Sequence, residues 1–200
     1  AGAVTAATAA NAAAPATPLD DPTLTPLLEM SPTLQADLDA LQADGYTVRW
    51  GSAGGGSWID SGAREIVIDS NMQGHGEALA MVIAHETGHH KFSEPDNRDS
   101  KEAMVMVLLR DEAAATINNA QVRSEILAAG GPDIGFPGIH ADQYEAITDQ
   151  LLAGEITQEE ALSQIAEQFK TEQTSTTGQT YEDYYGQRWT VLDEIKSWFS

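Results

Sequence analysis

Apolar side chains recur at the three-to-four-residue spacing of an α-helix along much of this chain. The clearest start signal is Ser31-Pro32, because serine caps a helix N-terminus and proline fits its first turn. Gly45, Pro95 and Gly130 mark the ends of the first three helical stretches. The pattern predicts helices at about residues 31–43, 77–91, 100–129, 141–153, 157–170 and 181–199.

Short strand-like segments lie between the first two of these helices. We predict strands at about residues 46–51, 57–60 and 65–69, separated by glycine-containing turns. Residues 19–30 contain proline and leucine without a regular period, so we expect an irregular segment packed on the surface. The order of elements predicts an α+β fold, mainly α, with a small three-stranded sheet beside helix 77–91 and a helical C-terminal half.

The N-terminal segment differs in composition from the rest of the chain. Residues 1–18 are almost all Ala, Thr, Gly, Asn and Pro, without the large side chains that anchor a segment to a core. Such a composition is typical of a linker. We therefore expect a linker at residues 1–18 and one domain at residues 19–200, tethered to a larger protein.

Charge and cysteine content exclude several classes of function. Ten Lys and Arg stand against 31 Asp and Glu, which gives a net charge of −21 and argues against nucleic-acid or anionic-membrane partners. No apolar run is long enough to predict membrane insertion. The chain has no cysteine, which excludes disulfides, thiolate metal ligands and a cysteine nucleophile.

The strongest chemical signal is the segment His85-Glu86-Thr87-Gly88-His89, which ends an apolar run. Residues four apart lie one turn above each other on a helix, so the two histidines can bind one metal ion. Glu86 would then lie where it can accept a proton from bound water. The alternative is a solvated helix face with two uncommitted histidines. The apolar context favours the metal site.

A catalytic zinc site needs a third protein ligand. This ligand could come from the residues directly after the motif or from the following helix. The metzincin pattern requires Gly and then His or Asp after the motif, but Phe92 and Pro95 occupy those positions. A ligand from the following helix is the remaining arrangement. Glu112 is the candidate, because the small residues 113–115 beside it would let that helix approach closely.

Other assignments of the acidic residues remain open. Asp111 is the nearest rival to Glu112, or else a carboxylate that orients a ligand histidine. Glu102 and Glu125 are weaker candidates. Asn119 and Arg123 share a helix face with Glu112, and a polar stripe on an apolar helix needs partners if it is buried. A metal with its surrounding ligands would supply them, whereas an exposed stripe would need none.

The remaining histidines and a tyrosine cluster are secondary candidates. His90 follows the motif directly and does not share its face, His75 precedes the helix, and His140 lies in a Gly/Pro-rich loop from which it could reach a reaction oxyanion. Tyrosine hydroxyls can also stabilise an oxyanion, although such clusters are more often core packing. The cluster consists of Tyr181, Tyr184 and Tyr185, next to Arg188. Residues 180–186 also weakly resemble an aspzincin element, with Glu182 where that family has Asp.

The motif together with residues 111–115 resembles the gluzincin clan of zinc metallopeptidases. Residues 118–125 are similar to segments of small bacterial effector and toxin zincins, including C-terminal domains of type VI secretion spike and Rhs-type proteins. The resemblance implies a zincin-like fold in which His85, His89 and Glu112 bind Zn²⁺ and Glu86 is the general base. It also implies that strand 65–69 is the edge that pairs with substrate backbone.

The resemblance further implies a protein or peptide substrate, an immunity protein as a partner, and secretion or translocation into a target cell. One alternative is an intracellular regulatory metallopeptidase of the repressor-cleaving type, which also combines H-E-x-x-H with a downstream Glu. A second is a non-catalytic binding module in which zinc only joins two helices. A metal-free, adhesin-like domain is the third.

Overall fold

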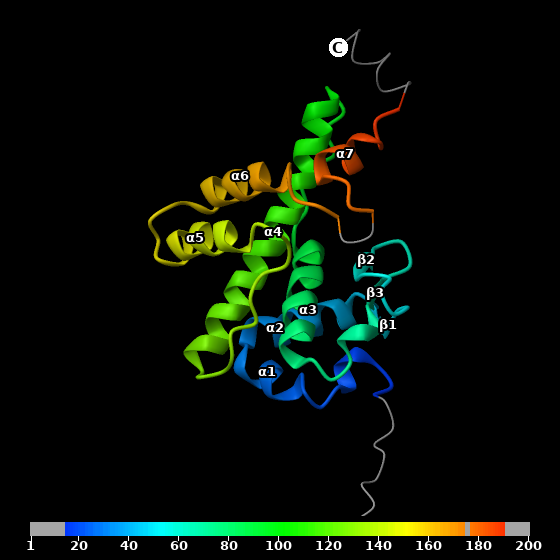
Figure 1. Cartoon of the computed structure of the whole chain (residues 1–200), viewed down its shortest axis with the longest axis vertical. Helices are drawn as coiled ribbons and strands as arrows, with labels where there is room; N and C mark the ends of the chain where they lie inside the picture. The colour runs from blue at the N-terminus through cyan, green and yellow to red at the C-terminus, as the bar shows by residue number, and fades with distance from the viewer. Residues whose placement is uncertain (1–14, 175–176, 191–200) are drawn as a thin grey trace, which may run out of the picture.

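The computed structural model describes residues 15–174 and 177–190 (Figure 1). It shows a mainly helical α+β architecture with one small mixed sheet, as the sequence predicts. The helices are α1 (Thr25–Met30), α2 (Pro32–Ala43), α3 (Gly76–Lys91), α4 (Lys101–Ala128), α5 (Ala141–Leu152), α6 (Gln158–Phe169) and α7 (Tyr181–Gly186). The strands are β1 (Thr47–Trp50), β2 (Trp58–Asp60) and β3 (Glu65–Ile68), and two 3-10 turns are η1 (Pro18–Asp20) and η2 (Ser70–Met72).

Helix starts follow the capping residues of the sequence. The Ser31 hydroxyl accepts a hydrogen bond from the backbone N–H of Leu34 at the start of α2. At α6, Thr157 and Glu160 form the reciprocal pair of bonds of a capping box. Gly45 ends α2 in the left-handed region, with φ of 80°. The predicted boundaries of α2 to α6 are therefore confirmed to within one or two residues.

The sheet has the strand order β1-β3-β2, with β1 parallel and β2 antiparallel to β3. Ile66 on β3 pairs with Val48 on one side and with Ile59 on the other. The expectation that residues 65–69 form the substrate-binding edge is therefore wrong. The Ile-Val-Ile run of β3 is buried, as expected for a strand with neighbours on both sides. The edge strand next to the metal-site candidates is β2.

Helix α4 passes through two hydrophobic cores. Its C-terminal part contributes Val122 and Ile126 to a core with the sheet and α1 to α3. Its N-terminal part contributes Met104 and Leu109 to a second core with α5, α6 and α7. In Figure 1 the sheet and α7 lie on one side of α4, whereas α5 and α6 lie on the other. The boundary between the two cores falls between Ile117 and Val122, about two turns beyond Glu112.

Two predicted segments differ from the structure. Residues 19–30 are not irregular throughout, because Leu24 and Leu27 anchor α1 in the first core. The helix expected at 181–199 ends at Gly186, after which turn hydrogen bonds join Arg188 to Tyr185 and Trp189 to Gly186. The rest of that prediction lies outside the described residues.

The N-terminal linker prediction also falls mostly outside the described residues. Within them, Pro18 is buried in η1, and the Trp50 indole N–H donates to the carbonyl of Pro15 at 3.1 Å. Across the described ranges, every helix is too short or too polar to cross a membrane.

Candidate metal centre

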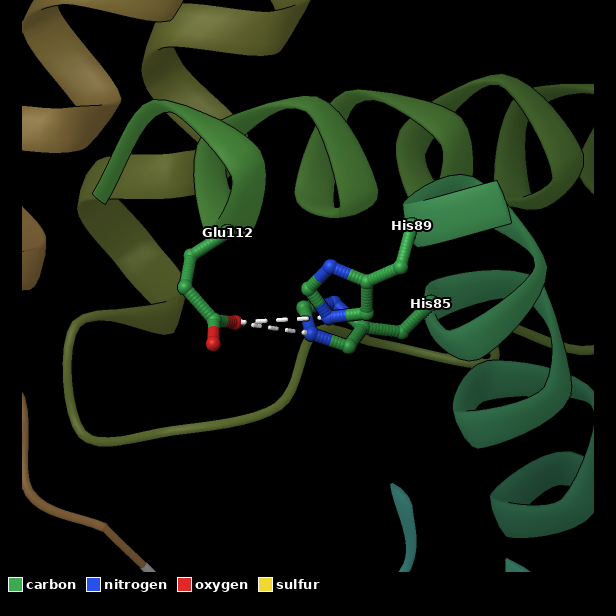
Figure 2. Close-up of side chains that lie close together, drawn as sticks. All are labelled: His85, His89 and Glu112. Carbon is green, nitrogen blue, oxygen red and sulfur yellow. Dashed lines mark hydrogen bonds and ion pairs between the residues drawn. The ribbon is translucent and has the colours of Figure 1, made fainter. Parts of the chain in front are cut away.

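Three of the side chains singled out in the sequence meet at one point. Figure 2 shows the imidazoles of His85 and His89 extending from α3 toward the carboxylate of Glu112 on α4. Oε2 of Glu112 lies 3.2 Å from Nε2 of His85 and 3.6 Å from Nε2 of His89. One ligand atom from each residue lies within 4.8 Å of the others, so the cluster could hold a metal ion.

The close approach of α3 and α4 depends on small residues at their crossing. A Cβ atom at Gly88 would lie 2.6 Å from the Cα atom of Ala115 and 2.9 Å from the Cβ atom of Asn118. Real side chains do not approach this closely, so only glycine fits here. Gly88 inside the motif and the alanines after Glu112 thus bring the two histidines and the glutamate together. The close helix approach predicted from residues 113–115 is confirmed.

Asp111 occupies a different place from Glu112. Its Oδ2 lies 2.9 Å from Nδ1 of His89, on the side of the ring opposite the cluster. A carboxylate in this position fixes the ring orientation and leaves Nε2 available for a metal. The structure therefore places Asp111 as a histidine-orienting residue. The Nδ1 atom of His85 is also buried but has no partner among the described residues.

Glu86 is buried beside the cluster, with 7% of its surface exposed. Burial raises the pKa of Glu86 above its usual range. The charges of His89 and His85 and a hydrogen bond from the Ile59 backbone lower this pKa, but burial outweighs them. The Glu112 carboxylate acts in the same direction as burial. A carboxyl group with a raised pKa takes up a proton more readily at neutral pH, which suits a general base.

His89 and Glu112 stabilise each other's charged forms. Burial alone would lower the pKa of His89, but the Glu112 charge and the hydrogen bond to Asp111 outweigh it and raise this pKa to about 10. Burial alone would raise the pKa of Glu112, but His89, His85 and Tyr185 lower it to about 2. In the metal-free protein at neutral pH the cluster therefore contains an ion pair.

Tyrosines from α7 complete the surroundings of the cluster. The Tyr185 hydroxyl donates a hydrogen bond to Oε1 of Glu112, the oxygen that does not face the histidines. The Tyr181 and Tyr184 side chains line the same cleft. Burial and the charge of Glu112 raise the pKa of Tyr181 and of Tyr185, so both hydroxyls stay protonated and able to donate. The tyrosine cluster thus packs together and also lines the site.

The cleft over the cluster measures about 480 Å³. Its walls come from β2, α3, α4 and the α7 region, and they include Trp58, Ile59 and Arg188. An adjoining hollow of about 360 Å³ shares His85, Glu86 and Tyr181 with the cleft. Its apolar walls include Met72, Met81, Val82 and Phe169. A chain lying across the cluster could place one apolar side chain in this hollow.

Several residues proposed from the sequence lie away from the cluster. His90 pairs with Asp44 at 2.9 Å, and His140 contacts Thr171 at 3.0 Å without lining the cleft. His75 precedes the first residue of α3. Glu125 accepts hydrogen bonds from Ser31 and Thr33, where it ties α4 to α2. Glu102 lies in the first turn of α4.

The polar stripe below Glu112 has a structural explanation. Asn119 donates to the carbonyl of Gly135, and Arg123 pairs with Asp133 and Glu145. These contacts join α4 to the loop that follows it and to α5, so the Asn119 amide N–H and the Arg123 guanidinium are satisfied without a metal. The stripe therefore serves the fold rather than the metal site.

Sequence reasoning missed the contribution of β2. Trp58 and Ile59 line the cleft, and the Ile59 backbone contacts Glu86. The only sequence signal was a short strand-like segment between glycine-containing turns, which does not show that this strand is at the edge.

Comparison of the chain with protein-family models, curated proteins and solved structures finds no match in any of the three.

Proposed function

We propose that this domain is a zinc-dependent peptidase with a zincin-like arrangement of the gluzincin type. One observation carries the proposal: His85, His89 and Glu112 converge on one point while the buried carboxyl group of Glu86 lies beside them. Two imidazoles and one carboxylate are the ligand set of catalytic zinc sites in thermolysin-like enzymes. Structural zinc sites, in contrast, have four protein ligands.

The donor set fits zinc in its chemistry. Imidazole nitrogen suits zinc better than it suits calcium or magnesium, which prefer oxygen ligands. Oε1 of Glu112 is engaged by Tyr185 and the Nδ1 atom of His89 by Asp111, so one atom of each residue remains for the metal. Zinc held by these residues would polarise the substrate carbonyl and lower the pKa of a bound water molecule.

The remaining groups supply the proton transfers and the orientation of the substrate. Glu86 accepts a proton from the attacking water and delivers it to the amine nitrogen that leaves. The Tyr181 hydroxyl, which stays protonated, supports the developing negative charge on the carbonyl oxygen. The outer edge of β2 offers main-chain groups to an extended peptide, and the adjoining apolar hollow accepts a side chain.

The experiment that tests the peptidase proposal compares two glutamates of the same helix. Glu86→Gln should bind one zinc per chain and lose activity by about 100-fold or more on a mixture of randomised peptides. Glu77→Gln changes an exposed carboxylate at the start of α3 and should retain activity. His85→Ala should lose both zinc and activity. An active Glu86→Gln protein would contradict the proposal.

We further propose that the peptidase acts as an effector domain delivered into a target cell. The linker-like N-terminal composition and the resemblance to effector zincins support this role. Expression of the wild-type chain should slow bacterial growth in one compartment, cytoplasm or periplasm, while Glu86→Gln does not. Harmlessness of the wild-type chain in both compartments would contradict the effector role and leave the regulatory peptidase as the alternative.

A further inference from the structure

Cations are scarce in this chain, and most of the described ones are paired. The sequence has 10 Lys and Arg against 31 Asp and Glu. Six described cations form ion pairs with carboxylates, namely Arg49, Lys91, Arg98, Arg110, Arg123 and Lys170. Arg188 forms no ion pair with any carboxylate in the described ranges. Arg64 and Lys101 likewise form no ion pair in the described ranges, but of these three cations only Arg188 lines the cleft over the metal-site candidates.

Arg188 lies at the candidate metal centre. It lines the same cleft as His89 and Glu112, and no other lysine or arginine of the described residues does so. Its guanidinium carbon lies 4.9 Å from the ring centre of Tyr185 and 5.9 Å from that of Tyr184. The hydroxyl of the same Tyr185 ring donates to Glu112. A single side chain thus connects Arg188 to the cluster.

The cation–π contacts with the tyrosine rings leave the N–H groups of the guanidinium available for a ligand. The rings attract the cation and restrict its motion, and neither contact is a hydrogen bond, so the tyrosine rings do not use up its N–H donors. The N–H groups project in the plane of the guanidinium, where they match the two oxygens of a carboxylate. Arg188 is exposed, so these donors are accessible from the cleft.

The overall charge makes this cation selective. A net charge of −21 repels anionic ligands from most of the surface. A carboxylate that reaches the cleft therefore finds at Arg188 an accessible cation with no competing carboxylate already bound. Such a contact would hold the ligand within reach of the neighbouring cluster.

We propose that Arg188 binds a carboxylate of the substrate and so selects peptides that carry this group close to the scissile bond. This role of Arg188 rests on the peptidase function proposed above. The carboxylate is either the C-terminal one or an Asp or Glu side chain, and both would be bound by the same two N–H groups. Arg188 is thus a specificity-determining residue of the cleft.

The test measures binding of randomised peptide pools to the zinc-loaded Glu86→Gln protein, which keeps the peptides intact. Two pools of acetylated pentapeptides differ only in a C-terminal carboxylate or amide. Two further amidated pools contain either Asp or Asn at one fixed position, which separates a side-chain carboxylate from a terminal one. Peptides retained by the immobilised protein are quantified by mass spectrometry. The same measurement is made on Glu86→Gln proteins that also carry Arg188→Gln, Arg188→Lys or the control Arg49→Gln. The control removes a cation from β1.

We expect about a tenfold preference for a carboxylate pool over its uncharged match, as is usual for hydrogen bonds to charged groups. The preference should vanish with Arg188→Gln at unchanged zinc content, persist in part with Arg188→Lys, and be unaffected by Arg49→Gln. Equal retention of matched pools, retention of none, or a preference that survives Arg188→Gln would overturn the inference.

Cleavage of the same pools by the wild-type protein keeps the two proposals separate. Cleavage without a carboxylate preference in binding overturns only the role of Arg188. Carboxylate-selective binding without cleavage overturns only the peptidase function.

Discussion

Tyr185 and Glu112, which are 73 positions apart, share a hydrogen bond that fixes the carboxylate of the metal-site cluster. Because Oε1 of Glu112 accepts from the tyrosine hydroxyl, Oε2 is the oxygen that faces both histidines. The short helix α7 therefore contributes to the candidate metal site although it supplies no candidate ligand.

Tyr185→Phe removes this hydrogen bond and leaves the ring in place. We expect zinc affinity to fall about 10-fold, as it does when partners of metal ligands are removed from other proteins. Competition with a chromophoric zinc chelator measures the change. Tyr184→Phe is the matched control, because the Tyr184 hydroxyl is not bonded to the cluster, and its affinity should stay within about twofold. Equal effects of the two substitutions would show that the Tyr185 hydroxyl does not position Glu112.

Gly88→Ala inserts a methyl group where α3 meets Ala115. The helices must separate, so we expect the free energy of unfolding to fall by about 1–3 kcal/mol and zinc affinity to fall with it. Urea unfolding of the metal-free protein measures the first effect and chelator competition the second. Gly62→Ala is the control, since an added Cβ there meets only the Asp60 carboxylate, at 3.3 Å. A stable Gly88→Ala protein with normal zinc affinity would contradict the role given to this crossing.

Asp111→Asn keeps the shape of the side chain and removes its charge. The His89 ring loses the anionic partner at its Nδ1 atom, and we expect zinc to bind about 10-fold to 100-fold more weakly. The control Asp39→Asn alters an exposed carboxylate on α2 and should leave the affinity unchanged. If Asp111 were itself the third ligand in place of Glu112, Asp111→Asn would abolish zinc binding and Glu112→Gln would not.

Zinc binding should release a proton from His89. In the metal-free protein the pKa of His89 is about 10, so at neutral pH its ring carries a proton that the metal must displace. We expect the apparent zinc affinity to rise about tenfold per pH unit between pH 7 and 9. Calorimetry in two buffers of different ionisation enthalpy counts the protons. Zinc binding without proton release would contradict the ion pair between His89 and Glu112.

The same pair makes the stability of the metal-free protein depend on pH in both directions. The pKa of His89 is raised from 6.5 to about 10, so its stabilising effect is complete below pH 6.5 and is lost as pH rises toward 10. The pKa of Glu112 is lowered from 4.5 to about 2, so its contribution is present above pH 4.5 and is lost as pH falls through 2. The urea concentration at the unfolding midpoint should therefore be highest between pH 4.5 and 6.5. Glu112→Gln should flatten its dependence on pH above pH 6.5.

The sequence by itself determined the local features of this protein. Capping residues such as Ser31 and Thr157 and the apolar runs placed α2 to α6. These signals act over a few neighbouring positions, so they are readable without the fold. The pairing of His85 with His89 belongs to the same class, because a single helical turn brings the two rings to one face.

Only the tertiary structure decided which distant residues join them. Asp111 and Glu112 are neighbours in sequence but point in different directions from α4, and the crossing at Gly88 determines that Glu112 faces both histidines. The strand order likewise made β2, not β3, the edge beside Glu86. Such contacts depend on how whole helices and strands pack against each other, and a local pattern carries no record of that packing.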